Sequence, residues 1–168
     1  MKLNLGCGFR KMPGYINIDN RPEVSPDLVC DLTKGIPYKD SSIEHVRAVD
    51  FLEHIPIGKT VQMIEEIYRV LRPGGMLSHF TPSTDGRGAF QDPTHVSFWN
   101  KNSWLYYMDD AYRNLYGIKA KFRGDNKDIL TDKDMHIVHT TGHLKAVKEQ
   151  NDLDCNTGDK TGEGQTVH

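Results

Sequence analysis

The chain contains 168 residues, of which 37% are hydrophobic and 26% are charged, and its formal net charge is −2. This length allows one domain with a hydrophobic core but not two domains of ordinary size. The near-neutral charge, without blocks of lysine and arginine among aromatic residues, does not support a nucleic-acid partner.

Two further classes of protein are disfavoured. The cysteines are isolated in the sequence, so neither a disulfide framework nor a zinc site is expected; they are Cys7, Cys30 and Cys155. No apolar run approaches the roughly 20 residues of a membrane span, and the first predicted strand begins too early for a signal peptide. We therefore expect a cytoplasmic protein without membrane association.

The first half of the chain predicts alternating strands and connections. The strands are expected at residues 2–6, 15–19, 28–31, 45–50 and 76–81. One amphipathic helix precedes the last of them, with Thr60 as its N-cap and apolar residues at Val61, Ile64, Ile67, Tyr68 and Leu71. The sequence Arg72-Pro73-Gly74-Gly75 ends this helix, because proline cannot continue the helical ladder.

The connections between the first strands are unusually short. Only residues 9–14 separate the first glycine turn from the next strand, whereas a helical crossover needs about a dozen residues or more. We therefore expect a sheet with few helices and one under-covered face that is available to a partner subunit, which is compatible with a homo-oligomer.

The second half of the chain predicts a different arrangement. After Pro82 the sequence is rich in turn-forming and aromatic residues, which predicts a loop and a short helix near 101–115 that could act as a lid. Segments 118–124 and 135–148 predict a closing hairpin. Residues 149–168 carry five acidic residues against one lysine, a net charge of −4 that leaves +2 on residues 1–148. This last segment has almost no large apolar side chains, so we expect a flexible acidic tail.

A glycine turn and a carboxylate indicate a nucleoside site. Gly6 and Gly8 follow the first strand, where glycine lets the backbone approach a ligand closely, and Asp19 ends the second strand, where a carboxylate suits a ribose diol. Lys11 stands where the dinucleotide fingerprint needs a third glycine, which disfavours a nucleotide-dependent oxidoreductase.

Five sequence blocks occur together in the first half of the chain: LNLGCG (3–8), GYINID (14–19), Asp31-Leu32 with IPYKDSSIEHV (36–46), DFLEHI (50–55) and IYRVLRPGGML (67–77). With these blocks the chain resembles the class I S-adenosylmethionine-dependent methyltransferases, in particular the small type 11 group. The resemblance implies an α/β fold over residues 1–148, with a pared-down Rossmann-like (doubly wound), mostly parallel sheet and an antiparallel edge strand.

The resemblance implies S-adenosylmethionine as the cofactor. It assigns the ribose to Asp19, the adenine to Asp31 and Leu32, and the methionine end to the remaining residues, which are Gly6, Cys7, Gly8, Asp50 and Phe51. Asp50 departs from the histidine that is often found at its position. Structural alternatives stay open, since Asp19 could cap a turn, Asp31 could be an ordinary strand-end carboxylate, and Cys7 suits a small filler residue better than a nucleophile.

The acceptor side is expected around Asp92-Pro93-Thr94-His95, which is flanked by aromatic residues. His95 and Asp92 are the candidate catalytic residues, because a histidine can take a proton from an attacking hydroxyl or amine near neutral pH. The alternative is that Asp92 and Thr94 only stabilise a turn. In the pair Glu53-His54, adjacent side chains point in different directions, so at most one of them can face a pocket.

No metal ligand is predicted. Three histidines lie close together in sequence, but strand alternation places only His139 and His143 on one face, without His136.

The sequence therefore predicts methyl transfer from S-adenosylmethionine to an oxygen or nitrogen atom of a small-molecule or glycan-like acceptor. The alternative from another class is a module that binds S-adenosylmethionine or a nucleoside without catalysis.

Truncation after Lys148 should leave the melting temperature nearly unchanged, because residues 149–168 offer no apolar core. Differential scanning calorimetry of the truncated and full chains measures this. A drop of more than about 4 °C, which corresponds to about 1 kcal/mol, would show that the tail docks on the domain.

Overall fold

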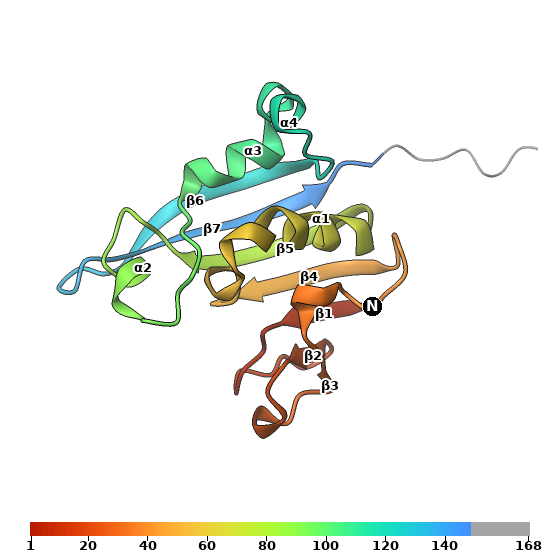
Figure 1. Cartoon of the computed structure of the whole chain (residues 1–168), viewed down its shortest axis with the longest axis horizontal. Coiled ribbons are helices and arrows are strands. Elements are labelled where there is room, and N and C mark those ends of the chain that lie inside the picture. The colour runs from red at the N-terminus through yellow and green to blue at the C-terminus, as the bar shows by residue number, and fades with distance from the viewer. Residues whose placement is uncertain (149–168) are drawn as a thin grey trace, which may run out of the picture.

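The computed structural model describes residues 1–148, so the predicted tail at 149–168 lies outside the described residues. Seven strands form one sheet in the order β3-β2-β1-β4-β5-β7-β6 (Figure 1). They are β1 (Lys2–Leu5), β2 (Ile16–Asp19), β3 (Leu28–Val29), β4 (Ile43–Val49), β5 (Leu71–Pro82), β6 (Phe122–Asp132) and β7 (Ile137–Ala146).

The sheet is parallel from β3 to β5, and an antiparallel hairpin closes one edge. Strand β7 pairs antiparallel with both β5 and β6, which places β6 outermost. This confirms the predicted Rossmann-like fold. The first hairpin strand differs from the prediction of 118–124, since β6 begins at Phe122 and continues to Asp132, whereas β7 lies within the predicted segment 135–148. No helix within residues 1–148 is long and apolar enough to cross a membrane.

One face of the sheet is covered by helix α1 (Thr60–Val70). The helix buries Met63, Ile64, Ile67 and Val70 in a core that includes Leu3, Val46 and Leu77 of the sheet. Two details of the predicted helix are wrong. Lys59 holds the N-cap position without a capping bond from its side chain, while the Thr60 hydroxyl donates to the Ile57 carbonyl, and Val61 is exposed.

The end of α1 also differs from the prediction. The helix ends at Val70, and β5 begins at Leu71 and contains the segment predicted as the helix stop. Leu71 pairs with Ile43, and the next pair joins Met76 to His45, so residues 72–75 form a wide bulge. Proline and glycine can end a helix, but they also occur at bulges in strands, and here they interrupt a strand.

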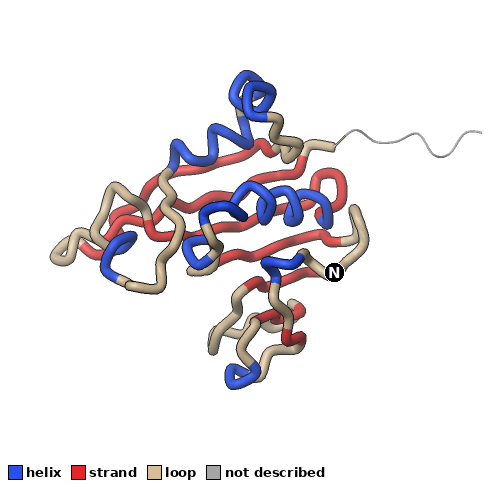
Figure 2. The backbone as a smooth tube through the Cα atoms, in the orientation of Figure 1, coloured by secondary structure: helices blue, strands red, loops and turns tan. Residues whose placement is uncertain are grey.

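The opposite face of the sheet carries polar side chains. The Tyr15 hydroxyl lies 2.7 Å from His45 Nδ1, and Ser78 Oγ lies 2.8 Å from both His45 Nε2 and His143 Nδ1. Helices α1, α3 and α4 lie on the viewer's side of the sheet in Figure 1, and Figure 2 shows mostly loop in the connections between β1, β2 and β3. This is the under-covered face that the short connections predict.

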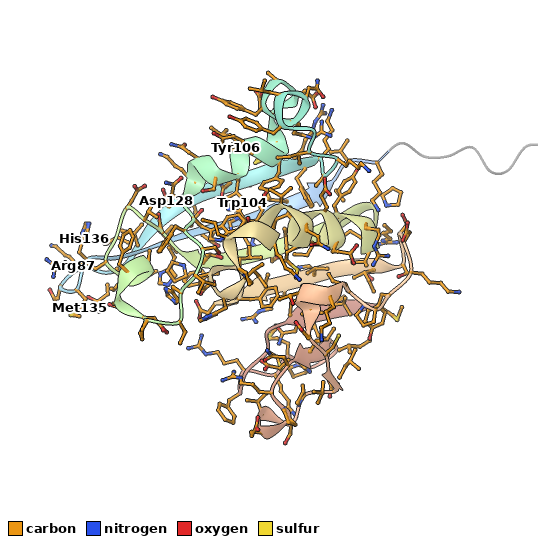
Figure 3. All side chains as sticks on the ribbon, in the orientation of Figure 1. Arg87, Trp104, Tyr106, Asp128, Met135 and His136 are labelled. Carbon is orange, nitrogen blue, oxygen red and sulfur yellow. The ribbon has the colours of Figure 1, made fainter. Side chains whose placement is uncertain are left out.

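The predicted helix near 101–115 is divided into three short helices: a 3-10 helix (Lys101–Trp104), α3 (Leu105–Met108) and α4 (Asp110–Tyr116). Asp109 breaks it by adopting an extended conformation and capping α4, with its carboxylate accepting from Ala111 N and Tyr112 N. Trp104 points into the core and stacks on His79 with ring centroids 3.9 Å apart (Figure 3). Trp104 and Tyr107 are therefore part of the core packing, whereas α4 buries none of its residues.

His79 gives a prediction for stability against pH. Burial lowers its pKa to about 3, so the folded protein keeps a neutral imidazole while the unfolded chain takes up a proton. The free energy of unfolding should therefore fall as the pH falls below about 6.5, by up to about 1.4 kcal/mol per pH unit from this group alone.

The His79→Gln variant should lose this part of the pH dependence between about pH 6 and about pH 4. Urea unfolding followed by tryptophan fluorescence measures it, with His136→Gln as a control at an exposed histidine. Equal slopes in the wild type and in His79→Gln would contradict the prediction.

Candidate functional site

A cavity of about 360 Å³ opens at the carboxyl edge of the parallel strands. Its size is within the range of small-molecule sites, about 300–1,000 Å³, and its position is where doubly wound sheets bind ligands. It is lined by Gly6, Asp19, Asn20, Arg21, Cys30, Asp31, Leu32, Thr33, Asp50, Phe51, His54, Ile55 and Thr94. We call the side formed by His54, Ile55 and Thr94 the rim.

The loop after β1 brings backbone to the cavity. Gly6 and Gly8 have φ of +59° and +49°, and a Cβ on Gly6 would overlap the ring of Phe51. Only glycine therefore fits between this ring and the cavity. Cys7 is buried, and burial raises the pKa of its thiol, which agrees with a filler residue. Of the predicted loop residues, Gly6 lines the cavity, and Cys7 and Gly8 lie behind it.

Asp19 lines the cavity and also holds the loop. Its Oδ2 accepts from Gly8 N at 2.8 Å, and its Oδ1 accepts from Arg21 N at 3.0 Å and from Arg21 Nε at 3.2 Å. Burial opposes ionisation of Asp19, but these hydrogen bonds outweigh it and hold the pKa below its ordinary value. Since a carboxylate has about four acceptor positions, Asp19 can stabilise its turn and still accept from a ligand.

Asp31 and Leu32 form the opposite wall. Asp31 caps the 3-10 helix Leu32–Lys34, with its Oδ1 accepting from Thr33 Oγ1 at 2.7 Å and from Thr33 N at 3.1 Å. The Thr33 hydroxyl is the main reason that the pKa of Asp31 is lowered. Leu32 is buried and supplies an apolar surface. Asp31 therefore lines the cavity and also has the purely structural role that the sequence left open.

Asp50 lies where β4 ends, with a left-handed φ of +48° that aspartate tolerates better than most residues. Its Oδ2 accepts from Arg10 Nη1 at 2.9 Å. Arg10 could not be assigned from the sequence, because only the fold brings it to Asp50. Asp50 and Arg10 place opposite charges beside Gly6 and Phe51.

At the rim, His95 contacts His54, with ring centroids 5.2 Å apart. His95 Nδ1 lies 3.1 Å from the carbonyl oxygen of Ala89, which can only accept, so Nδ1 carries the proton and the Nε2 lone pair is free. Asp92 Oδ2 is 3.8 Å from that Nε2. Asp92 Oδ1 accepts from Thr94 N and Thr94 Oγ1, so the predicted turn is also present. His54 and Thr94 line the cavity, while His95 and Asp92 lie just outside it.

Glu53 precedes the rim residue His54, and the sequence left its role open. It is 2% exposed, and neither carboxylate oxygen has a hydrogen-bond partner in the described part of the chain. Burial is the main cause that raises its pKa to about 8. As expected for neighbours in a turn, only His54 of this pair lines the cavity.

The three histidines of the C-terminal hairpin bind different neighbours. His139 Nδ1 contacts Thr131 Oγ1, His143 Nδ1 contacts Ser78 Oγ, and His136 Nε2 contacts the Asp85 carbonyl.

The family model for the methyltransferase domain matches residues 3–78. A comparison with curated proteins found no match. Among solved structures, a methyltransferase of Haloferax volcanii in complex with the Trm112 methyltransferase activator is 16% identical, with a TM-score of 0.62 over 89% of this chain and 83% of that one. A S-adenosylmethionine-dependent methyltransferase of Methanosarcina mazei is 17% identical, with a TM-score of 0.57 over 87% of this chain and 91% of that one.

A third solved structure contains a cofactor product. It is the 1,6-didemethyltoxoflavin-N1-methyltransferase of Burkholderia thailandensis with bound 1,6-didemethyltoxoflavin and S-adenosylhomocysteine, 10% identical, with a TM-score of 0.61 over 88% of this chain and 71% of that one. At these identities the likeness shows the fold, and the family match shows the domain. The cavity also fits the cofactor, because it joins a glycine backbone, a buried carboxylate and an apolar wall. Residues 3–78 match the methyltransferase domain, and the fold and the cavity are those of a class I S-adenosylmethionine-dependent methyltransferase.

Proposed function

We propose that the chain methylates an oxygen or nitrogen atom of a small-molecule or glycan-like acceptor, which approaches through the rim. The observation that carries this proposal is the cavity itself. Its walls contain six residues assigned to the cofactor from the sequence, and its remaining side is the histidine-containing rim. S-Adenosylmethionine, when bound, supplies a methyl group on a sulfonium, whose displacement needs positioning and exclusion of water more than covalent help.

Each part of the cavity wall suits one part of the cofactor. Asp19 would accept hydrogen bonds from the ribose, while Asp31 and Leu32 would contact the adenine. The pair Arg10 and Asp50 would bind the methionine carboxylate and ammonium, because their charges are complementary to a zwitterion. Gly6 would leave space for this end of the cofactor.

His95 is the proposed proton acceptor on the acceptor side. Its free Nε2 can take the proton from the attacking group, and its Nδ1 bond to Ala89 holds the required tautomer. Asp92 would stabilise the imidazolium that forms, since its Oδ2 lies 3.8 Å from Nε2.

Two exposed aromatic rings flank His95 in sequence and support a small acceptor. Phe90 and Phe98 are 63% and 49% exposed, and their rings stack with centroids 5.3 Å apart. Ala89 and Ser97, the residues before them, are fixed by hydrogen bonds to His95 and Leu52. An exposed aromatic surface of this kind suits the flat face of a sugar or of a heteroaromatic ring.

Replacement of Asp19 by alanine should weaken binding of S-adenosylhomocysteine by about 10- to 150-fold, which is the loss of a charge-assisted hydrogen bond of about 1.5–3 kcal/mol. Isothermal titration calorimetry measures this. Glu44→Ala, which removes an exposed carboxylate outside the cavity, is the control. Because Asp19 also holds the Gly8 loop, Asp19→Asn and thermal melting separate lost contacts from lost folding. Unchanged affinity in a folded Asp19→Ala variant would overturn the assignment.

Replacement of His95 by alanine should lower the rate of S-adenosylhomocysteine formation by about 10²- to 10⁴-fold with a panel of hydroxyl and amine acceptors, while S-adenosylmethionine still binds normally. The control is His143→Ala, on the other face of the sheet. Loss of cofactor affinity would place His95 in the cofactor site or in the fold. Full activity would exclude it as the base, and no turnover with any acceptor in the wild type would favour a binding module.

A further inference from the structure

Three side chains of the types that bind metals meet at the rim. One ligand atom from each of Glu53, His54 and His95 lies within 4.8 Å of the corresponding atoms of the other two. Glu53 and His54 belong to the 3-10 helix Leu52–His54, and His95 belongs to the loop that follows α2 (Gly88–Gln91). We call these three residues the rim cluster.

Both histidines are oriented as metal ligands usually are. His54 Nδ1 lies 3.3 Å from the Thr94 carbonyl oxygen, and His95 Nδ1 lies 3.1 Å from the Ala89 carbonyl oxygen. A carbonyl only accepts, so each Nδ1 carries the proton and each Nε2 keeps a free lone pair. Histidines that bind metals typically donate their other ring nitrogen to a carbonyl or carboxylate in this way.

Glu53 supplies a second and independent observation. Its carboxylate is 98% shielded, and both oxygens are without a hydrogen-bond partner in residues 1–148. An unpaired buried carboxylate is costly unless a proton or a cation neutralises it. One of its oxygens lies within 4.8 Å of a ring nitrogen of each histidine, so all three side chains can bind the same cation.

The backbone fixes this arrangement. The Glu53 carbonyl accepts from Val96 N at 2.9 Å and from Ser97 N at 3.0 Å, and Ser97 Oγ donates to the Leu52 carbonyl at 2.8 Å. These bonds join two segments that are about 40 residues apart in sequence. They hold His95 beside the other two residues, while the exposed His54 is free to adjust.

We propose that the rim cluster binds a divalent transition-metal ion. Two imidazoles and one carboxylate suit Zn²⁺ or Fe²⁺, whereas Mg²⁺ and Ca²⁺ prefer oxygen ligands. Ligand atoms around tetrahedral Zn²⁺ are about 3.4 Å apart, so the three side chains would draw closer together on binding. Three protein ligands would leave a fourth position for a water molecule or another oxygen ligand.

This site differs from the three histidines of the C-terminal hairpin, which have separate neighbours. The proposal of ion binding rests on the rim cluster alone, and its use in methyl transfer rests on the proposed function. With an ion bound, His95 Nε2 would be a ligand and could not also take a proton, so the ion would replace His95 in the role that the proposed function gives it. An experiment can therefore contradict ion binding without contradicting methyl transfer, and the reverse.

The test is titration of the full chain with Zn²⁺ after removal of metals by a chelator, without cofactor or acceptor. Calorimetry should give one ion per chain, and Co²⁺ should give visible absorption bands of a site with nitrogen and oxygen ligands. Glu53→Gln, His54→Ala and His95→Ala should each weaken binding at least about tenfold. His139→Ala and His143→Ala are matched controls and should bind as the wild type does. Mg²⁺ should not compete.

No binding of Zn²⁺ or Co²⁺ by the wild type would overturn the proposal. Unchanged affinity in His54→Ala, which removes an exposed side chain and should fold normally, would overturn it too, because the ion would then lie elsewhere. Circular dichroism checks the folding of Glu53→Gln and His95→Ala. Metal binding without any methyl transfer would support the site while contradicting the proposed function.

Discussion

The hydrogen bond from Gly8 N to Asp19 Oδ2 is the constraint on which the cavity depends, because no helix packs the loop between β1 and β2. A polar network extends it behind the cavity. The buried Asn17 Oδ1 accepts from Asn4 Nδ2 at 2.9 Å and from Met12 N at 2.8 Å, and Asn4 Oδ1 accepts from Arg47 Nη1 at 2.8 Å. Side-chain amides here do what a packed helix does in longer connections, since they fix the loop against the strands.

This substitution of polar bonds for helix packing has an energetic consequence. An apolar interface tolerates small losses of contact, but loss of one partner in a buried network leaves the other unsatisfied, at a cost of about 1–3 kcal/mol. The two faces of the sheet are therefore stabilised by different interactions. Burial of apolar side chains under α1 stabilises one face, while directional bonds among Asn4, Asn17 and Arg47 stabilise the region behind the cavity.

The sequence predicts those features of the fold that depend on residues close together in the chain. The glycines after β1 and the carboxylates after β2 and β4 could be placed, because parallel strands bring their carboxyl ends to one edge. The break at Asp109 and the bulge at residues 72–75 could not be predicted, because capping and strand pairing override the hydrophobic periodicity there. The approach of His95 to Glu53 depends on backbone bonds between segments about 40 residues apart, which no periodicity reports. Arg10 was missed for the same reason, because only the fold brings it to Asp50.

The two sides of the cavity differ in how far the protein satisfies its own polar groups. Asp19 and Asp31 accept hydrogen bonds from neighbouring residues, so these walls are fixed before a ligand binds. At the rim, the Glu53 carboxylate and the Nε2 atoms of the two histidines retain free capacity. Because folded proteins satisfy nearly all their buried polar groups, free capacity held in place by backbone bonds indicates that the missing partner comes from outside the chain. We therefore propose that the walls bind the cofactor, whose shape is constant, and that the rim binds the acceptor.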